Sequence, residues 1–209
     1  MILYHMDRAH SLKPGMQLEL HNPMELGEDV ANSLLMKNFP DGISQHGMNY
    51  LSASCAVMKE IVVLGNQAFI NEASINENLH IASNRMIELA VELVRQAYFP
   101  QMPSRFVSLF AVTAIDKFHG WEDSLGKVGD SPIYKLEVPT ATRELDGQWL
   151  RGGISFGWDN DLSGFYLGLL THGLYDMAYR YWSGEISDSP MMECLVPLPV
   201  KIGELVKVD

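Results

Sequence analysis

The sequence has little cysteine and little positive charge. Two of its 209 residues are cysteines, Cys55 and Cys194, and they form no CxxC pair and have no histidine at metal-ligand spacing. No disulfide framework or metal site is expected, and a reduced, cytoplasmic protein is the default expectation. Lysine and arginine number 15 against 26 aspartates and glutamates, so the net charge is -11. A uniformly acidic chain binds nucleic acid poorly unless its basic residues cluster.

Long apolar runs and several common cofactor motifs are also absent. No segment approaches 18 consecutive apolar residues, and the apolar start of the chain is soon broken by His5, Asp7 and Arg8. We therefore expect neither a membrane span nor a signal-peptide core. The patterns GxxxxGK[ST], GxGxxG and HExxH do not occur, which removes P-loop, dinucleotide-fold and zinc-protease interpretations.

The order of the predicted elements favours an α+β fold in a single domain over residues 1–209. Hydrophobic residues make up 47% and charged residues 20%, as in soluble globular domains. The clearest helix covers 76–98, where apolar residues recur every three or four positions, and a second long helix is predicted at 162–182. Because strands do not alternate regularly with helices, α+β is favoured over a doubly wound sheet.

Strands and shorter helices are predicted elsewhere. Pro197 and Pro199 interrupt the apolar tail, so it should form two short strands at an edge or a bend. Residues 52–69 fit either helix or strand, and residues 147–160 fit a loop or a strand pair. The remaining predictions are strands at 2–6, 17–20, 106–112 and 133–138, a short helix near 27–36, and a helix at 113–121 capped by Thr113.

Three segments carry side chains suited to chemistry, and the first is the opening strand. Alternation along a strand turns Tyr4 and His5 to opposite faces, so one of them can reach a cleft. His5 could hydrogen-bond a sugar hydroxyl or a carbonyl there. The alternative is a half-buried histidine that the backbone satisfies.

The second and third segments are PSRFVSLFA and SPMMECLVPLPVKI. In the former, Ser104 and Ser108 share a strand face and could fix an acidic side chain, whereas Arg105 could clamp a diphosphate. The alternative is a solvated strand face. In the latter, Glu193 opens an apolar strand, and it lies either at the wet end of that strand or in a pocket.

Taken in order, these segments resemble the ADP-ribosyltransferase superfamily, in the branch whose first strand carries histidine. The shared features are a first-strand His5, an S-x-x-x-S strand followed by a short helix, and a final E-C-L-V-P-x-P-V-x-I strand that begins at Glu193. The chain also resembles a bacterial group of uncharacterised proteins with P-S-R-F-x-S-L-F-A and Y-W-x-G segments. The resemblance covers both ends and the middle, so residues 22–100 would be a helical insertion.

The resemblance implies two small antiparallel sheets around an NAD cleft, with NAD as the substrate. Glu193 would be catalytic, binding the 2′-hydroxyl of the nicotinamide ribose and favouring the oxocarbenium-like transition state. Ser104 or Ser108 would orient Glu193.

The same resemblance implies the residues that bind NAD. His5 would hydrogen-bond the adenosine ribose or the nicotinamide side, and Arg8 or Arg105 would face the diphosphate. Tyr50 or Tyr134 would stack on nicotinamide.

The expected function is transfer of ADP-ribose from NAD to a macromolecule, or hydrolysis of NAD. The acidic charge favours a protein target slightly over nucleic acid, and no membrane partner is expected. Met191 stands where members that modify arginine often carry an acidic residue, which disfavours an arginine target. The family suggests a toxin, an effector or a phage-defence factor.

Two alternatives stay open from the sequence. The chain could be a non-catalytic binding module that keeps this fold, or an unrelated α+β protein whose motif order is a coincidence. In the latter case His5, Ser108 and Glu193 would not meet in one cleft.

Overall fold

Helices and strands are mixed along the chain, which confirms the α+β class. The structure is a computed structural model that describes residues 1–51, 61–64, 67–70, 72–139, 141–151, 154–159, 164–169 and 171–207. Within 52–82 and 152–172 only the backbone of these residues is described. No described helix combines the length and the apolar character that crossing a membrane requires.

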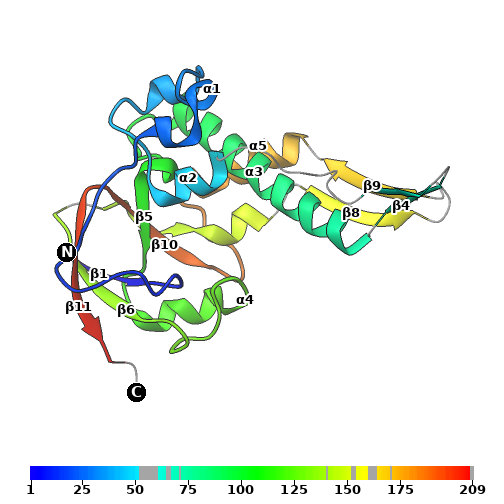
Figure 1. The fold of residues 1–209 in the computed structure, drawn as a ribbon. Helices are drawn as coiled ribbons and strands as arrows, with labels where there is room; N and C mark the ends of the chain where they lie inside the picture. The colour runs from blue at the N-terminus through cyan, green and yellow to red at the C-terminus, as the bar shows by residue number, and fades with distance from the viewer. Residues whose placement is uncertain are drawn as a thin grey trace.

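Two small antiparallel sheets form the centre of the molecule (Figure 1). The larger has the order β1-β6-β11-β2, with bounds Ile2–Met6, Ile133–Glu137, Val200–Val206 and Gln17–Leu18. The smaller has the order β5-β10-β7, with bounds Ser108–Ala111, Met192–Pro197 and Leu145–Asp146. A bridge between Tyr4 and Val112 links the first strand of one sheet to the end of β5.

The strand β10 separates two hydrophobic cores because its side chains alternate between the faces of the sheet. Cys194 and Val196 belong to the core that also contains Leu3 and Leu136 of the larger sheet. Leu195 belongs to the second core, which two long helices build on the opposite face. Glu193 has the same parity as Leu195, so it points to the helical side.

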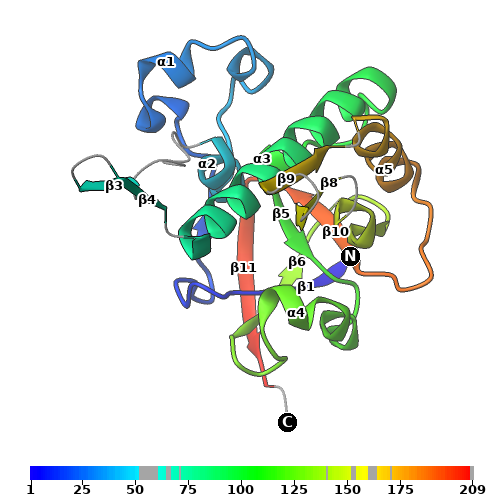
Figure 2. The ribbon, with the colours of Figure 1, turned by 90° about the vertical axis from the view of Figure 1, so that its right-hand side faces the viewer.

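The two long helices are α3 (Glu72–Tyr98) and α5 (Thr171–Ser183), which pack against each other and on the smaller sheet. Figure 2 shows the α2 helix (Gln45–Leu51) beside α3 on one side of β5. The short helices α1 (Glu28–Ala31) and α4 (Glu122–Leu125) lie at opposite ends of the molecule (Figure 1).

Two hairpins extend beyond the first turns of α3 and away from both sheets (Figure 1). One pairs β3 (Ile61–Leu64) with β4 (Gln67–Ile70), and the other pairs β8 (Ile154–Asp159) with β9 (Gly164–Leu169). Of the ambiguous segment 52–69, the described parts are therefore strand, and residues 52–60 and 65–66 lie outside the described residues. Of the segment 147–160, Gly147–Arg151 form a 3₁₀ helix and Ile154–Asp159 form β8, and residues 152, 153 and 160 lie outside the described residues.

Most sequence-based elements are confirmed, and three are wrong. The second long helix begins only at Thr171, because Gly164–Leu169 pair with β8 as a strand that contains the poor helix formers Gly164 and Gly168. Thr113 does not cap a helix; Ala114 precedes the 3₁₀ helix, and the Thr113 hydroxyl bonds Glu144.

The helix α2 was not predicted from the sequence. Gly47 lets α2 pack close to the backbone of Phe106, because a Cβ at position 47 would lie 2.8 Å from the Phe106 carbonyl oxygen.

Candidate functional site

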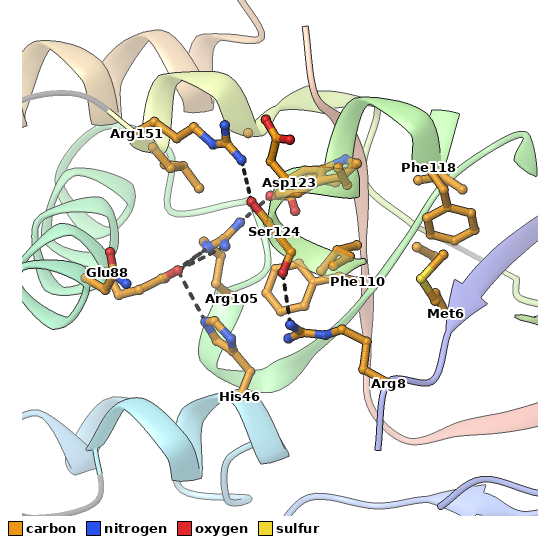
Figure 3. A pocket seen from close by; sticks show the side chains of 18 of the residues that line it. Met6, Arg8, His46, Glu88, Arg105, Phe110, Phe118, Asp123, Ser124 and Arg151 are labelled. Carbon is orange, nitrogen blue, oxygen red and sulfur yellow. Dashed lines mark hydrogen bonds and ion pairs between the residues drawn. The ribbon is translucent and has the colours of Figure 1, made fainter. Parts of the chain in front are cut away.

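A cavity of about 850 Å³ lies where both sheets meet α2 and α3, and we call it the central cavity. Its volume falls within the range of small-molecule sites, roughly 300 to 1,000 Å³. Figure 3 shows two groups of polar side chains around it. The polar and aromatic lining residues that matter below are His5, Arg8, His46, Tyr50, Glu88, Arg105, Phe110, Trp121, Ser124, Arg151 and Glu193.

Arg105 is the centre of the first group. Its Nε and Nη2 atoms donate to the Glu88 carboxylate at 2.9 and 3.0 Å, and its Nη1 atom forms an ion pair with Oε1 of Glu193. The guanidinium also lies over the ring of Phe110, 4.5 Å from its centroid. Arg105 is 7% exposed, Glu88 6% and Glu193 4%, so three charges share one buried cluster.

Tyr181 of α5 holds Glu193 from the other side. Its hydroxyl donates to Oε1 of Glu193 at 2.6 Å and accepts a hydrogen bond from Nη1 of Arg105 at 2.8 Å. Both bonds to Glu193 therefore use one oxygen. Within the described part of the chain no donor bonds Oε2, and the carboxylate lines the central cavity. One oxygen of a fixed carboxylate is thus left for a ligand.

The pKa values follow from burial and from this pairing. Burial by itself would raise the pKa of Glu88, but Arg105 and then His46 outweigh it and lower the pKa to about 2. Burial would lower the pKa of Arg105, yet Glu193 and Glu88 raise it well above its usual value. Burial raises the pKa of Tyr181 far above its usual value, so its hydroxyl stays protonated as a donor.

His46 of α2 lies beside this cluster, in an aromatic environment. Its ring centroid is 4.4 Å from that of Tyr50 and 4.7 Å from that of Phe110. Its Nε2 atom is buried, lies 3.4 Å from Oε1 of Glu88 and makes no hydrogen bond of good geometry (Figure 3). Burial, followed by the charge of Glu88, raises the pKa of Tyr50.

The hydrogen bond that His5 makes determines its tautomer. Its Nδ1 atom lies 2.7 Å from the carbonyl oxygen of Phe110. A carbonyl oxygen only accepts, so Nδ1 carries the hydrogen, and in the neutral ring Nε2 is an acceptor. Burial lowers the pKa of His5, which favours the neutral ring. The backbone satisfies one nitrogen, as the alternative interpretation held, but the ring also lines the central cavity.

The second polar group consists of Arg8, Arg151 and Ser124. Arg8 donates from Nη1 to the Ser124 carbonyl oxygen at 3.2 Å, and Arg151 donates from Nη2 to the Ser124 hydroxyl. Both guanidinium groups converge on this residue at the cavity (Figure 3). Neither forms an ion pair with any carboxylate among the described residues. These two cations are therefore available to an anionic ligand.

The structure brings five of the seven predicted site residues to the central cavity: His5, Arg8, Tyr50, Arg105 and Glu193. Glu193 lies in a pocket, so the wet-end alternative is wrong. Since two buried carboxylates already bind Arg105, Arg8 is the predicted arginine that remains free to face a diphosphate.

Ser104 and Ser108 do not orient Glu193, and that prediction is wrong. The Ser104 hydroxyl donates to Glu92 at 2.6 Å, and the Ser108 hydroxyl donates to the Ser104 carbonyl oxygen at 2.8 Å. The reason is local: residues Arg105–Val107 form a 3₁₀ turn capped by Ser104, so the strand begins only at Ser108. Tyr134 is also outside the cavity lining, and its hydroxyl donates to Leu12.

Sequence reasoning missed Glu88, His46, Tyr181 and Arg151. Glu88 and Glu92 belong to the long helix predicted at 76–98, and both are buried. Their spacing of four residues places them on one face of that helix, which is the signal that could have marked them as a pair. Nothing in the sequence linked Tyr181 to Glu193.

Another pattern in the sequence, GISFG at 153–157, fits the GxSxG spacing of hydrolases. That motif requires a sharp turn from a strand into a helix at the serine. Here Ser155 lies inside β8, which continues to Asp159 and pairs with β9. The backbone context of a nucleophile elbow is therefore not present. Among the described residues no cluster of three or more His, Cys, Asp or Glu side chains could hold a metal ion.

Comparison with known proteins identifies the family and no activity. The model of a family described as "protein of unknown function (DUF2441)" matches residues 3–208, so the chain belongs to this family. No curated protein matches the chain.

Proposed function

We propose that this family member is an NAD-dependent ADP-ribosyltransferase that modifies a macromolecule, with hydrolysis of NAD as its basal reaction. The observation that carries the proposal is the position of Glu193. This buried carboxylate lines the central cavity with one oxygen held by Arg105 and Tyr181 and the other free. The ADP-ribosyltransferase resemblance assigns the catalytic role to this same residue.

The charges around the cavity also suit NAD. Glu88 and Glu193 outnumber the single guanidinium of Arg105, so the buried cluster has a net negative charge, and aromatic rings border it. Such a site attracts a cationic aromatic ring, and the nicotinamide of NAD is a pyridinium cation. Arg8 and Arg151 then supply the positive charge that a diphosphate needs.

The neutral His5 fits a ribose, since its free Nε2 can accept a hydrogen bond from a hydroxyl group. Tyr50 has its ring on the cavity and a pKa raised by burial, so it is a neutral stacking surface. These features support the predicted NAD contacts of both residues.

In the proposed mechanism, the free oxygen of Glu193 accepts a hydrogen bond from the 2′-hydroxyl of the nicotinamide ribose. The bond between the ribose C1′ atom and the ring nitrogen breaks, and its electron pair neutralises the pyridinium. Positive charge then develops on the ribose, which the fixed carboxylate stabilises because it needs no reorganisation. A nucleophile on the target, or water, attacks C1′.

One feature favours a second candidate, a non-catalytic binding module. The ion pair with Arg105 offsets part of the charge of Glu193, which weakens the electrostatic stabilisation that the carboxylate can give. This candidate predicts NAD binding without turnover.

The test is release of nicotinamide from NAD by the purified protein, compared with Glu193→Gln. Glutamine keeps the shape and a hydrogen-bonding oxygen but removes the charge. We expect release by the wild type and a loss of at least 100-fold in the variant. Glu204→Gln, an exposed glutamate on β11, is the matched control and should release nicotinamide at the wild-type rate. Binding of NAD without release would favour the binding module, and neither binding nor release would refute both candidates.

A further inference from the structure

We infer that His46, positioned by Glu88, is the proton acceptor for the oxygen nucleophile that attacks ADP-ribose. This inference rests on the proposed function and adds to it a second catalytic residue and an acceptor class. The acceptor would be an O–H group, which is water in the basal reaction.

His46 and Glu193 lie on the same cavity and are connected through buried side chains. Glu88 contacts His46 at one side and Arg105 at the other (Figure 3). Arg105 in turn binds Glu193. A substrate whose ribose lies on Glu193 therefore has an imidazole within the same enclosed space. Glu193 would bind the ribose and His46 would accept the proton, and Arg105 and Glu88 would connect these two residues.

The imidazole of His46 differs from most buried polar groups because neither of its nitrogens makes a hydrogen bond with a described residue. Buried polar atoms are normally hydrogen-bonded, and an exception calls for a role. Nε2 of His46 is buried without a hydrogen bond, and no described residue bonds Nδ1. The ring is held by aromatic contacts instead.

Glu88 is suited to stabilise the imidazolium that proton transfer creates. It is a carboxylate 3.4 Å from Nε2, and Arg105 keeps its pKa near 2, so it stays ionised. The other charged groups near the ring are Arg105 and, around the adjacent Tyr50, Arg8 and Arg85. A carboxylate beside a histidine fixes the orientation of the ring and stabilises the positive charge that the ring gains during proton transfer, as in other carboxylate–histidine pairs.

His5 also has a free nitrogen on the cavity, but it is the weaker candidate. Burial lowers its pKa, and no carboxylate forms an ion pair with it among the described residues. The Phe110 carbonyl and the charge of Asp7 favour an imidazolium at His5, but burial outweighs them. The geometry therefore assigns hydrogen bonding to His5 and proton acceptance to His46.

The proton balance of the step is complete with these groups. The oxygen of the acceptor forms a bond to C1′ as the bond from C1′ to nicotinamide breaks, and that electron pair goes to the ring nitrogen. The proton of the acceptor O–H group moves to the nitrogen of His46 that does not face Glu88. Release of this proton to solvent restores the neutral imidazole.

The test compares nicotinamide release by the wild type, His46→Ala and His46→Gln, with and without added imidazole. We expect a fall of about 100-fold or more in kcat with little change in KM, because general bases contribute roughly 10²- to 10⁴-fold. Added imidazole should restore part of the rate in His46→Ala, since the truncated side chain leaves a space on the cavity. A purely structural role would not give this rescue.

The matched control is His119→Ala, since the His119 side chain is 65% exposed and does not line the cavity. It should keep the wild-type rate. Wild-type rates in both His46 variants, with Glu193→Gln inactive, would overturn this inference and leave the proposed function intact. A loss that imidazole does not restore, in variants with wild-type melting temperatures, would also overturn it. No release by the wild type would instead refute the proposed function.

Discussion

Arg105 and Glu193 form a buried ion pair although 88 residues separate them in the chain. One comes from a 3₁₀ turn before β5 and the other from the second residue of β10, which pairs antiparallel with β5. Glu88 of α3 binds the same guanidinium. The site is thus assembled from three distant segments, and its geometry depends on the correct packing of helix on sheet.

Removal of the guanidinium should destabilise the fold strongly. Arg105→Met leaves two carboxylates buried without a counter-charge, and breaking a buried pair in this way costs about 3 to 5 kcal/mol. The measurement is the free energy of unfolding in urea. Arg180→Met is the control, because its ion pair with Glu185 is 48% exposed at both side chains and should contribute less than about 1 kcal/mol. Equal losses in the two variants would contradict the buried network.

A variant can test whether Ser104 stabilises the fold or, as predicted from the sequence, orients Glu193. Ser104→Ala removes hydrogen bonds to Glu92 and to the Phe106 backbone, so it should lower the free energy of unfolding by about 1 to 3 kcal/mol. Because the serine does not touch Glu193, the folded variant should release nicotinamide at the wild-type rate. A stable variant that has lost release would restore the original prediction.

Glu88 should give the fold a specific sensitivity to acid. Its pKa is about 2 in the folded protein against 4.5 ordinarily, so the unfolded state binds more protons between these values. The stabilisation is fully present above about pH 5. It is lost as pH falls towards 2, by roughly 3 kcal/mol in total at about 1.4 kcal/mol per pH unit.

The measurement for Glu88 is the urea unfolding free energy between pH 2 and pH 6, in the wild type and in Glu88→Gln. Other carboxylates, among them Glu144 and Asp146, also have lowered pKa values and contribute to the wild-type slope. The variant should therefore show a smaller slope with pH, not a flat line. Identical slopes would show that Glu88 is not paired in solution.

Position 147 should tolerate only glycine, because a larger residue would clash with the ring of Trp121. A Cβ at position 147 would lie 2.3 Å from the Cη2 atom of Trp121, whose indole donates to the Met192 carbonyl oxygen. Gly147→Ala should cost about 1 to 3 kcal/mol, as overpacking does. Trp121→Phe removes the clashing atoms, so the double variant should be more stable than the sum of the single effects predicts. Simple additivity would contradict the contact.

The sequence predicted the framework of the fold because its signals are local. Alternation and the proline breaks identified the tail strands, and helical periodicity identified most of α3. Prediction from the sequence was wrong where pairing between strands determines the secondary structure. At β9, for example, the residues form a strand because they pair with β8.

The candidate site shows the same limit. Glu193 and His5 were selected from their positions on predicted strands, independently of any family resemblance. Tyr181 contacts Glu193 and Glu88 contacts Arg105 only through tertiary packing, and no periodic pattern marks such contacts. A glutamate on a helix is usually solvent-exposed, so burial of Glu88 follows from the presence of Arg105 and not from its own neighbours.

The pair of arginines at Ser124 gives the sharpest test of how NAD would lie. Arg8→Gln and Arg151→Gln each remove one cation that no described carboxylate neutralises. If the diphosphate lies there, each change should weaken NAD binding about 5- to 20-fold, and the effect should shrink at high salt because partly exposed charges are screened.

The matched control ligand for these variants is nicotinamide riboside, which keeps the nicotinamide and its ribose but has no diphosphate. Its affinity, measured by calorimetry beside that of NAD, should be the same in the wild type and in both variants. Arg180→Gln is the control protein, since Arg180 is outside the lining of the central cavity. Equal weakening of both ligands would mean that the arginines shape the cavity. Unchanged NAD binding would mean that the diphosphate lies elsewhere, and the opposite orientation of NAD in the cavity would then have to be considered.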